Sequence, residues 1–595
     1  MESVGDARMN DCSGTAPAPE PKRQTQAKAQ GLVVAGMHRS GTSLTAGILE
    51  RLGVDMGQQL IPADSTNPRG FYEDAQIVAF HQQAFRRLLP RNASGHIDWG
   101  WCEEHALDTT CLEQFRPAAR RLVAERESKG VAWGFKDPRT TLLLDFWDSC
   151  IDDARYVMVY RAPWRVADSM QRLQAEVFLN HPGYAYHIWR EYNERLLDFF
   201  LRNRDRCVLI NVDALRNQLP RFQSLIVDKL KLKTSDVDLS GAFDEDLFGR
   251  AEIEDPRAAL TALAFPECQS LLEQLELVAD LTDERSMPPA IPASIRGDCV
   301  VKPSDPEVSI VIPTYNDAIY LIDSLASVEK CQIGNAEVII VDDGTEDEES
   351  QRILQALRER GYQIITQENR GLSAARNIGI ANSRGRFIIP LDADNRLCTG
   401  FVQAALEAFD ARPDLGVVYT DRQLFGKRTG AVHVMDFNLQ NLLFGNYIDA
   451  CAMFRRELWN DLEGYDERLH CWEDWEFWIR AGVHGWNFQH LDRIGFEYRV
   501  RTGSLNDRYP TLVARQKLRR HILVNHRQTL FDGLPGRVGS VCHWIERALP
   551  DSWKGFWKVV TTNGYWLMFW EAYGPGGLLT WPSVRKLWAT RLWRS

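Results

Sequence analysis

Residues 31–43 read GLVVAGMHRSGTS and decide the fold of the first half of the chain. The apolar run GLVVA is typical of a buried strand, and two glycines, Gly36 and Gly41, follow it. The next segment, GILERLG, has apolar residues at helical spacing and closes on Gly53. A strand, a glycine-rich turn and a helix in this order are the context of a phosphate-binding loop.

The loop lacks the lysine that usually follows the second glycine. Thr42 stands in that position, and the positive charge lies inside the loop at Arg39. Backbone N–H groups at a helix start still face an anion, and the helix dipole favours it. Without its lysine the loop is a weaker match to a nucleoside triphosphatase or kinase, which stays an alternative. A glycine-rich turn with no ligand is the plain alternative.

The bulk composition bounds the class of protein. A chain of 595 residues is too long for one core, so two or more domains are expected. A net charge of -11 without a basic stripe argues against a general nucleic-acid binder. Twelve cysteines without a C-x-x-C pair indicate neither a zinc site nor a disulfide framework, which fits a reducing compartment.

Composition and pattern divide the chain into five parts. We expect a disordered N-terminus over 1–29, a first α/β domain over 30–230, a helical extension with a Pro-rich linker over 231–304, a second α/β domain over 305–530 and a Trp-rich tail over 531–595. Neither a signal peptide nor a run of about twenty apolar residues is present, so we expect a cytoplasmic protein without a transmembrane helix.

The tail has two interpretations. Eight of the nineteen tryptophans lie between Trp544 and Trp593, interleaved with lysine and arginine. Such a segment could lie on the inner face of a membrane as a peripheral contact. Glycine and proline interrupt it, so packing on the second domain is the slightly favoured alternative.

Two further segments of the first half carry candidate anion ligands. GFKDPR places Lys136, Asp137 and Arg139 in one loop after a short strand. In VYRAPWRVADSM, Arg161 ends a strand and Ser169 lies about two turns along the following helix. Arg161 and Ser169 could together hold a second phosphate, since arginine offers fork-shaped donors. The alternative is an arginine paired with an acidic neighbour.

The segments GMHRSGTS, NPRGFYED, GFKDPR, VYRAPWRVADSM and WREYNERLL together resemble the sulfotransferase family, in its bacterial carbohydrate and protein-tyrosine-like branch, over about residues 31–225. The resemblance implies a P-loop-type parallel sheet and sulfuryl transfer from 3′-phosphoadenylyl sulfate (PAPS) without a metal. It implies that Arg161 and Ser169 hold the 3′-phosphate and that Arg39 replaces the missing lysine. The residues implied at the 5′ end are Gly36, His38, Arg39, Ser40, Gly41, Thr42 and Ser43.

A general base should accept the proton of the acceptor hydroxyl. Glu73 is the first candidate, because the related branch uses a glutamate after its first helix. Asp74 and His38 are rivals. A solvated loop acid is the plain alternative for Glu73.

In the second half, four apolar strand-like runs end in polar residues. VSIVIPTYN is followed by AEVIIVDDGTED with Asp343, by the helix LSAARNIGI with Arg376, and by RFIIPLDADNRL with Asp392 and Asp394. Ligands bind at the carboxyl ends of parallel strands in open α/β sheets. Two carboxylates spaced i, i+2 after a strand can jointly approach a divalent cation.

These runs resemble the inverting glycosyltransferases of family two, with the GT-A fold, over about residues 307–505. The resemblance implies a nucleotide-sugar site lined by Pro313, Tyr315, Asp343, Arg376 and Asp392. It also implies that Asp392 and Asp394 meet a Mg²⁺ or Mn²⁺ that bridges the diphosphate.

In GYDERLHCWEDWEFWIRAG the resemblance makes Asp474 the base that deprotonates the acceptor. A helix cap is its alternative. Arg499 and Arg501 stand where the family often has a metal-contacting histidine, so the third metal ligand stays open.

The leading hypothesis is a bifunctional enzyme that transfers a sulfuryl group and a sugar to a cell-surface glycan or glycolipid. The alternative keeps the glycosyltransferase and makes the first half a non-catalytic module that binds PAPS or another nucleotide.

Overall fold

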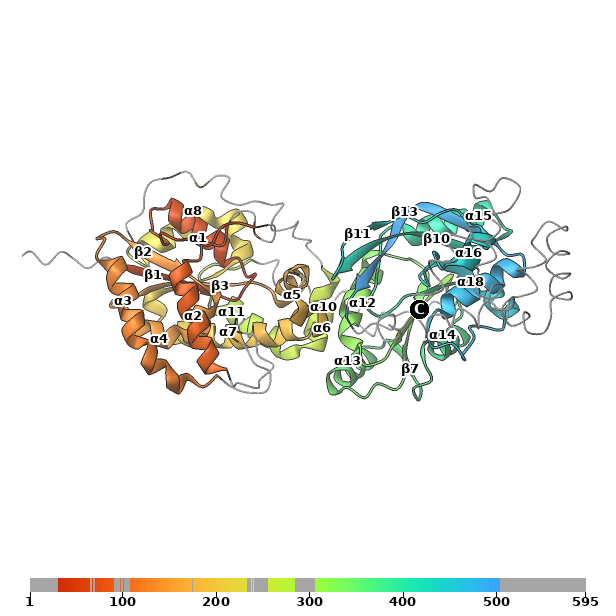
Figure 1. Cartoon of the computed structure of the whole chain (residues 1–595), viewed down its shortest axis with the longest axis horizontal. Helices are drawn as coiled ribbons and strands as arrows, with labels where there is room; N and C mark the ends of the chain where they lie inside the picture. Colours follow the sequence, from red (N-terminus) through yellow and green to blue (C-terminus); the bar gives the residue numbers. More distant parts are fainter. Residues whose placement is uncertain are drawn as a thin grey trace, which may run out of the picture.

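The computed structural model describes residues 30–502, apart from 65–66, 68–69, 90–96, 98–99, 101–106, 174, 233–236, 238, 240–254 and 284–304. The predicted disordered N-terminus, the Trp-rich tail and most of the Pro-rich linker lie outside the described residues. The described chain forms two lobes, which meet at helices α5, α6 and α10 of the first lobe and α12 of the second (Figure 1).

The first lobe is built on a parallel sheet with the strand order β2-β1-β3-β4. Its strands are β1 (Gly31–Gly36), β2 (Trp133–Lys136), β3 (Arg155–Tyr160) and β4 (Cys207–Asn211). They are short, mostly apolar runs that are almost entirely buried, as expected of a parallel sheet covered on both faces. The predicted α/β class is confirmed here.

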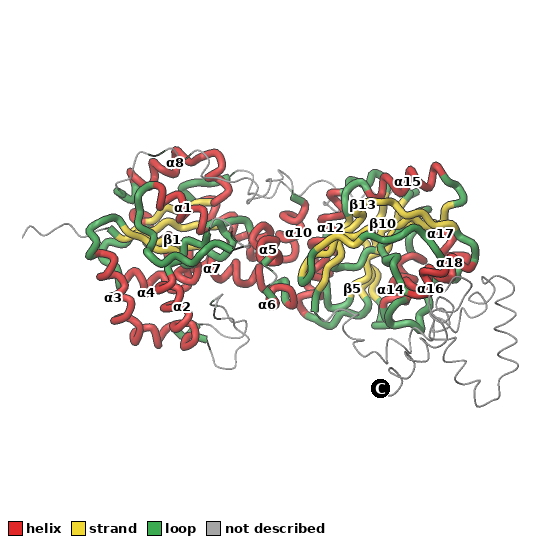
Figure 2. The backbone as a smooth tube through the Cα atoms, turned by 45° about the horizontal axis from the view of Figure 1, so that its top comes forward, coloured by secondary structure: helices red, strands yellow, loops and turns green. Residues whose placement is uncertain are grey.

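Helices cover this sheet on both sides (Figure 2). The helices of this lobe are, in chain order, α1 (Thr42–Arg51), α2 (Ala75–Leu88), α3 (Arg116–Glu127), α4 (Leu144–Asp148), α5 (Pro163–Arg172), α6 (Glu176–Asn180), α7 (Tyr184–Arg202), α8 (Leu215–Asp228), α10 (Pro256–Ala264) and α11 (Pro266–Val278).

The second lobe holds a nine-stranded mixed sheet with the order β7-β6-β5-β8-β12-β10-β13-β9, and β11 pairs with β10. The strands are β5 (Val308–Thr314), β6 (Ala336–Asp342), β7 (Gln363–Thr366), β8 (Phe387–Pro390), β9 (Arg396–Leu397), β10 (Leu415–Gly426), β11 (Gly430–Val432), β12 (Met453–Arg455) and β13 (Asn487–Val500). Strands β5 to β8 are parallel, as predicted, whereas β12 and β9 run antiparallel to their neighbours.

The helices of this lobe are α12 (Leu321–Lys330), α13 (Glu348–Glu359), α14 (Leu372–Ala381), α15 (Phe401–Ala411), α16 (Leu439–Phe444), α17 (Arg456–Asp461) and α18 (Glu473–Val483). The main apolar cluster of buried residues includes members from both lobes, among them Leu260 of α10 and Leu321 of α12. The predicted helical extension therefore does more than cap the first domain, because α10 packs on α12 and α13 of the second.

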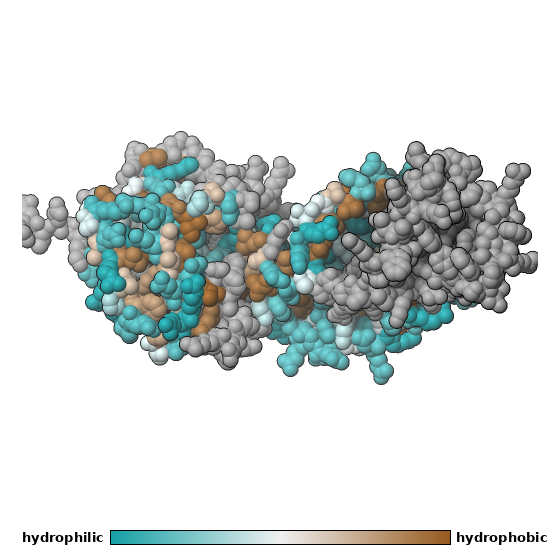
Figure 3. Space-filling model, viewed as in Figure 1, coloured by the Kyte–Doolittle hydropathy of each residue, from teal (hydrophilic) through white to brown (hydrophobic). Residues whose placement is uncertain are grey.

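On the face shown in Figure 3, hydrophilic residues cover much of the described surface of both lobes. Among the helices of the described part of the chain, none combines the length and the apolar character needed to cross a bilayer.

Candidate functional site

The first candidate site is the loop between β1 and α1. Gly36 ends β1, and its N–H donates to Thr141 Oγ1 at 2.8 Å. Gly41 has a φ of 91°, and a Cβ there would lie 2.2 Å from Val212 Cγ2. Only glycine fits this position, because both the left-handed backbone and the close contact exclude a side chain. The loop is thereby held tightly against β4 and the helix start.

The structure brings together the two sets of residues expected to hold PAPS. Arg39 Nε donates to Ser169 Oγ on α5 at 2.9 Å, so the loop and the expected 3′-phosphate ligand touch. The Arg161 guanidinium donates to both carboxylate oxygens of buried Asp213, each at 3.2 Å. The acidic partner that the sequence offered as the alternative for Arg161 is therefore present.

The three candidate bases differ in their surroundings. Glu73 accepts from Lys136 Nζ at 2.5 Å. Asp74 caps α2 by accepting from Gln76 N at 2.9 Å and pairs with Arg126 at 3.0 Å, which is a structural role. Burial, followed by the charge of Arg139, holds the pKa of His38 well below its ordinary value, so its imidazole is a weak base.

The sequence offered Lys136 as a candidate anion ligand without a specific role, and the structure places it beside the glycine-rich loop. Its Nζ is 3.2 Å from Ser43 Oγ as well as paired with Glu73. A lysine from the end of β2 thus supplies positive charge next to the loop that lacks its own. The signal was the KDPR motif directly after a strand.

The neighbouring Asp137 belongs to a buried network. It accepts from Arg139 Nε and Nη2 at 2.9 and 2.8 Å and contacts His81 Nδ1 at 2.9 Å. Trp147 Nε1 donates to the other nitrogen of His81. Burial would raise the pKa of Asp137, but its contacts with His81 and the charge of Arg139 outweigh burial and hold that pKa well below its usual value. This network fixes the loop that carries Lys136.

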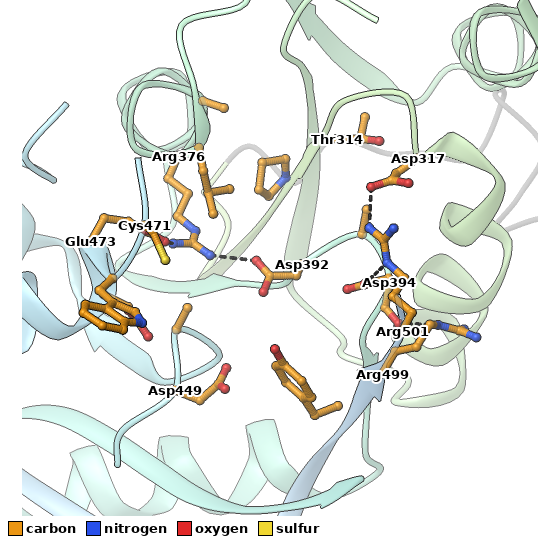
Figure 4. A pocket seen from close by; sticks show the side chains of 18 of the residues that line it. Thr314, Asp317, Arg376, Asp392, Asp394, Asp449, Cys471, Glu473, Arg499 and Arg501 are labelled. Carbon is orange, nitrogen blue, oxygen red and sulfur yellow. Dashed lines mark hydrogen bonds and ion pairs between the residues drawn. The ribbon is translucent and has the colours of Figure 1, made fainter. Parts of the chain in front are cut away.

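The second candidate site is a cavity of about 720 Å³ at the carboxyl ends of β5, β6 and β8 (Figure 4). All the residues expected in the second half line this one cavity, namely Pro313, Tyr315, Asp343, Arg376, Asp392, Asp394 and Asp474. The apolar strands carry them to one edge, because parallel strands end on the same side of a sheet.

Arg376 is the buried centre of one wall. Its Nη2 donates to Asp392 Oδ1 at 2.7 Å, and its Nη1 donates to Glu473 at the start of α18. Its side chain is only 1% exposed. One cation between two acids fixes the orientation of both carboxylates and offsets their charge.

Asp343 holds the loop at the start of α14. Its carboxylate accepts from Gln367 Nε2, Arg370 N and Gly371 N at 2.6 to 2.9 Å. Gly371 has a φ of 90° where the chain turns into α14. Asp343 therefore shapes the cavity through the backbone.

On the opposite wall, Arg501 bridges Asp394 and Asp317, with its Nε 2.7 Å from Asp394 Oδ2 and its Nη2 2.5 Å from Asp317 Oδ2. Arg499 Nε donates to the backbone carbonyl of Asp394 at 3.0 Å. Burial and the charge of Asp392 raise the pKa of Asp394, although Arg501 opposes them. Figure 4 shows the two acid–arginine pairs facing each other across the cavity.

Asp474 lies in the first turn of α18. It accepts from Trp475 N at 2.8 Å and from Asn446 Nδ2 at 2.9 Å. Burial, and then the negative charge of Glu473, raise its pKa to about 8. A carboxylate with this pKa can take a proton near neutral pH.

Sequence reasoning missed several lining residues, among them Asp449, Asn446 and Arg422. Asp449 precedes β12 and is 3.9 Å from Arg422 Nη1, and burial raises its pKa. No strand-end pattern marks these positions, because they come from a loop and from the middle of β10.

Asp392 and Asp394 fit the chemistry of a divalent cation. Their side chains are 31% and 17% exposed, and each has one oxygen engaged by an arginine. Mg²⁺ is commonly held by one or two carboxylates together with substrate phosphates. Among the described residues, one group of three possible metal ligands has its ligand atoms within 4.8 Å of one another. It consists of Asp421, His433 and Asp492 and lies outside this cavity.

Comparison with known proteins gives two family matches. The sulfotransferase family matches residues 31–236, and glycosyl transferase family 2 matches residues 309–462. The chain joins a sulfotransferase family domain to a family 2 glycosyltransferase domain. The α/β lobes are accordingly a P-loop-type sulfotransferase fold followed by a GT-A fold.

Two curated relatives illustrate the likeness. An uncharacterized protein, y4gI, from Sinorhizobium fredii is 26% identical over 267 residues, which are 43% of this chain and 28% of that protein. Chondroitin synthase from Escherichia coli is 28% identical over 195 residues, which are 32% of this chain and 28% of that protein. The chain thus spans little more than a quarter of the length of these relatives.

Two solved structures are similar to part of the chain. S. aureus TarS 1-349 in complex with UDP-GlcNAc has a TM-score of 0.34 at 20% identity and covers 39% of this chain and 69% of that one. The mannosyltransferase PcManGT from Pyrobaculum calidifontis, in complex with GDP-Man and Mn2+, has a TM-score of 0.31 at 17% identity and covers 57% and 91%.

Proposed function

We propose that the chain is a bifunctional carbohydrate-modifying enzyme. Its first domain transfers a sulfuryl group from PAPS, and its second transfers a sugar from a nucleotide sugar, with inversion, to a cell-surface glycan or glycolipid. The observation that carries the glycosyltransferase part is the cavity that Arg376, Asp392, Asp394 and Asp474 line together, and the contact of Arg39 with Ser169 supports the PAPS site.

In the glycosyltransferase cavity, Asp474 is the base. It accepts the proton of the acceptor hydroxyl as that oxygen bonds to the anomeric carbon and the sugar–diphosphate bond breaks. The raised pKa of Asp474 supports this role, because a base is most effective when its pKa is near the working pH.

The remaining groups hold the donor. Arg376 orients Asp392, and Arg501 and Arg499 orient Asp394. Asp392 and Asp394 would hold the divalent cation, which when bound neutralises charge on the leaving diphosphate. Asp343 keeps the loop before α14 in place around the nucleoside.

In the sulfotransferase domain, catalysis is charge stabilisation. Arg39, Lys136 and the N–H groups at the start of α1 surround the place where the 5′-phosphosulfate would lie. Glu73 is the proposed base, and it would have to release Lys136 to the sulfuryl oxygens as it takes the proton.

The test is a ligand screen on the full chain. We expect PAP and PAPS to bind without a metal, and one of the UDP-, GDP- or dTDP-sugars to bind with Mn²⁺. The variants Arg39→Ala and Asp392→Asn should each strongly weaken one of the two bindings and spare the other. Magnesium-dependent ATP binding that Arg39→Ala removes would instead support a kinase.

A second candidate function has an observation in its favour. Glu73 is paired with Lys136, Asp74 caps a helix and His38 is a weak base, so the first domain could bind PAPS without turnover. Binding of PAPS with no sulfuryl transfer across a panel of glycan acceptors would support this non-catalytic module and contradict the sulfotransferase activity.

A further inference from the structure

Helix α5 belongs to the sulfotransferase domain, but its last turn contacts two arginines of the glycosyltransferase domain. Its half-buried Gln171 accepts, through Oε1, from Arg499 Nη1 at 3.1 Å and from Arg396 Nη2 at 3.4 Å. Arg499 lines the cavity, and Gln171 does not. Gln171 is therefore one residue removed from the cavity, on the opposite side of the domain boundary.

Arg499 connects Gln171 to the Asp392–Asp394 turn. Its Nε donates to the Asp394 carbonyl at 3.0 Å, and its backbone N–H donates to Asn395 Oδ1 at 3.0 Å. Its Nη2 donates to Asp323 Oδ2 at 2.7 Å. The side chain is only 3% exposed, so each lost acceptor leaves a buried donor unsatisfied.

The contact is part of a larger boundary between the domains. Within the first domain, Asp168 of α5 pairs at 2.9 Å with Arg257 of α10, the helix that packs on α12 of the second domain. The Tyr320 hydroxyl of the second domain donates to the Leu179 carbonyl of the first at 3.4 Å. The guanidinium groups of Arg499 and Arg501 lie 4.9 and 4.8 Å from the centre of the Tyr320 ring. The two arginines thus pack on the ring of Tyr320, whose hydroxyl is held by the first domain.

We propose that Gln171 is a positioning residue of the glycosyltransferase site, so that this site is completed by the sulfotransferase domain. Gln171 holds Arg499, and Arg499 holds the backbone of Asp394 and Asn395. The orientation of the Asp394 carboxylate then depends on α5. The proposal rests on the proposed donor role of the cavity, and its test separates the two.

The experiment uses the full chain with Gln171→Met, which keeps the length of the side chain but removes the acceptor. Gln171→Glu is the rescue variant, because a carboxylate also accepts from Arg499 and Arg396. His187→Ala is the matched control: His187 contacts Glu349 across the same boundary at 3.0 Å, and neither residue lines the cavity.

Two readouts are needed. The first is the affinity for UDP and for GDP with Mn²⁺, measured by calorimetry. The second is hydrogen exchange of the amides of residues 391–398, which requires no ligand. We expect Gln171→Met to weaken nucleotide binding by about 3- to 30-fold, since it removes a hydrogen bond to a charged group, and to speed exchange in that segment. Gln171→Glu and His187→Ala should stay within about twofold of wild type.

Unchanged binding and exchange in Gln171→Met would overturn the proposal. An equal loss in His187→Ala would also overturn it, because it would point to general loosening of the boundary. If the wild type binds neither UDP nor GDP, UDP-sugars and GDP-sugars are excluded as donors in the proposed function. The hydrogen-exchange measurement still decides the role of Gln171. If Gln171→Met fails to fold, Gln171→Asn, which is too short to reach Arg499, replaces it in both measurements.

Discussion

The pH dependence of the glycosyltransferase reaction follows from the setting of Asp474. Its pKa is raised to about 8 by burial and by Glu473. A base must be ionised to act, so at pH 7 only about one tenth of the molecules are competent and at pH 8 about half. The kcat/KM should therefore rise about tenfold per pH unit below pH 7 and level off above pH 8.

The assay is release of nucleoside diphosphate from the nucleotide sugar that the enzyme accepts, measured from pH 5.5 to 9.5. Asp474→Asn should lower kcat/KM by about 10²- to 10⁴-fold and flatten the profile. Glu473→Gln should move the midpoint of the pH–rate profile to lower pH. It removes a negative charge that raises the pKa of Asp474, while the positive charge of Arg376, which lowers that pKa, remains. A wild-type midpoint near pH 4, or an active Asp474→Asn enzyme, would refute the reasoning.

The raised pKa of Asp474 also makes the stability of the fold depend on pH. A carboxyl whose folded pKa is raised holds its proton in the folded state while the unfolded chain loses it, so folding weakens as pH rises from about 4 to about 8. The contribution is about 1.4 kcal/mol per pH unit inside that window. Asp474→Asn should thus become more stable relative to wild type as pH rises, which urea unfolding at pH 6 and pH 8 would measure.

Three more predictions concern other residues. Arg39→Ala should weaken PAP binding by about 10- to 100-fold in calorimetry while Arg51→Ala, on exposed surface of α1, leaves it unchanged; equal losses would contradict the role of Arg39. Arg376→Gln leaves the buried Glu473 and the half-buried Asp392 without their cation and should lower the unfolding free energy by about 3–5 kcal/mol in urea, and a loss under 1 kcal/mol would contradict this. Chelation by EDTA should abolish nucleotide-sugar binding as Asp394→Asn does, and binding that survives both would exclude the cation.

Strand ends made much of the glycosyltransferase cavity predictable. Pro313, Asp343 and Asp392 each lie at or directly after an apolar run, and parallel strands end on one side of the sheet. The glycine-rich loop was predictable for the same reason, since Gly36 ends β1 and α1 begins at Thr42. Local pattern therefore marked the strand-end positions of both candidate sites, whereas the candidate role of Asp474 came from the family resemblance.

The partners of these residues were not predictable. Arg501 reaches Asp317 and Arg161 reaches Asp213, and each pair is set by how distant segments pack. The antiparallel strand β12, which carries the preceding Asp449 to the cavity, follows a loop with no strand-end signal. Such contacts depend on how segments that are distant in the sequence pack together, and no local spacing of residues indicates that packing.

Because one apolar cluster includes residues of both lobes, the cooperation of the two proposed activities has to be tested without separating the domains. Fusion raises the local concentration of one product near the next site, so a common acceptor should be doubly modified faster by one chain than by two. Cutting the chain into domains would expose the apolar contact of α10 with α12, and misfolding would then mimic lost cooperation.

Full-length variants avoid that problem. A mixture of Arg39→Ala and Asp474→Asn chains contains each activity once, on different molecules, with the boundary between the domains intact. At nanomolar enzyme the wild type should make doubly modified acceptor faster than the mixture at equal numbers of active sites, and mass spectrometry of the products would measure it. Equal rates would mean that the acceptor leaves after each transfer, and the joining of the two domains would then need an explanation other than local concentration.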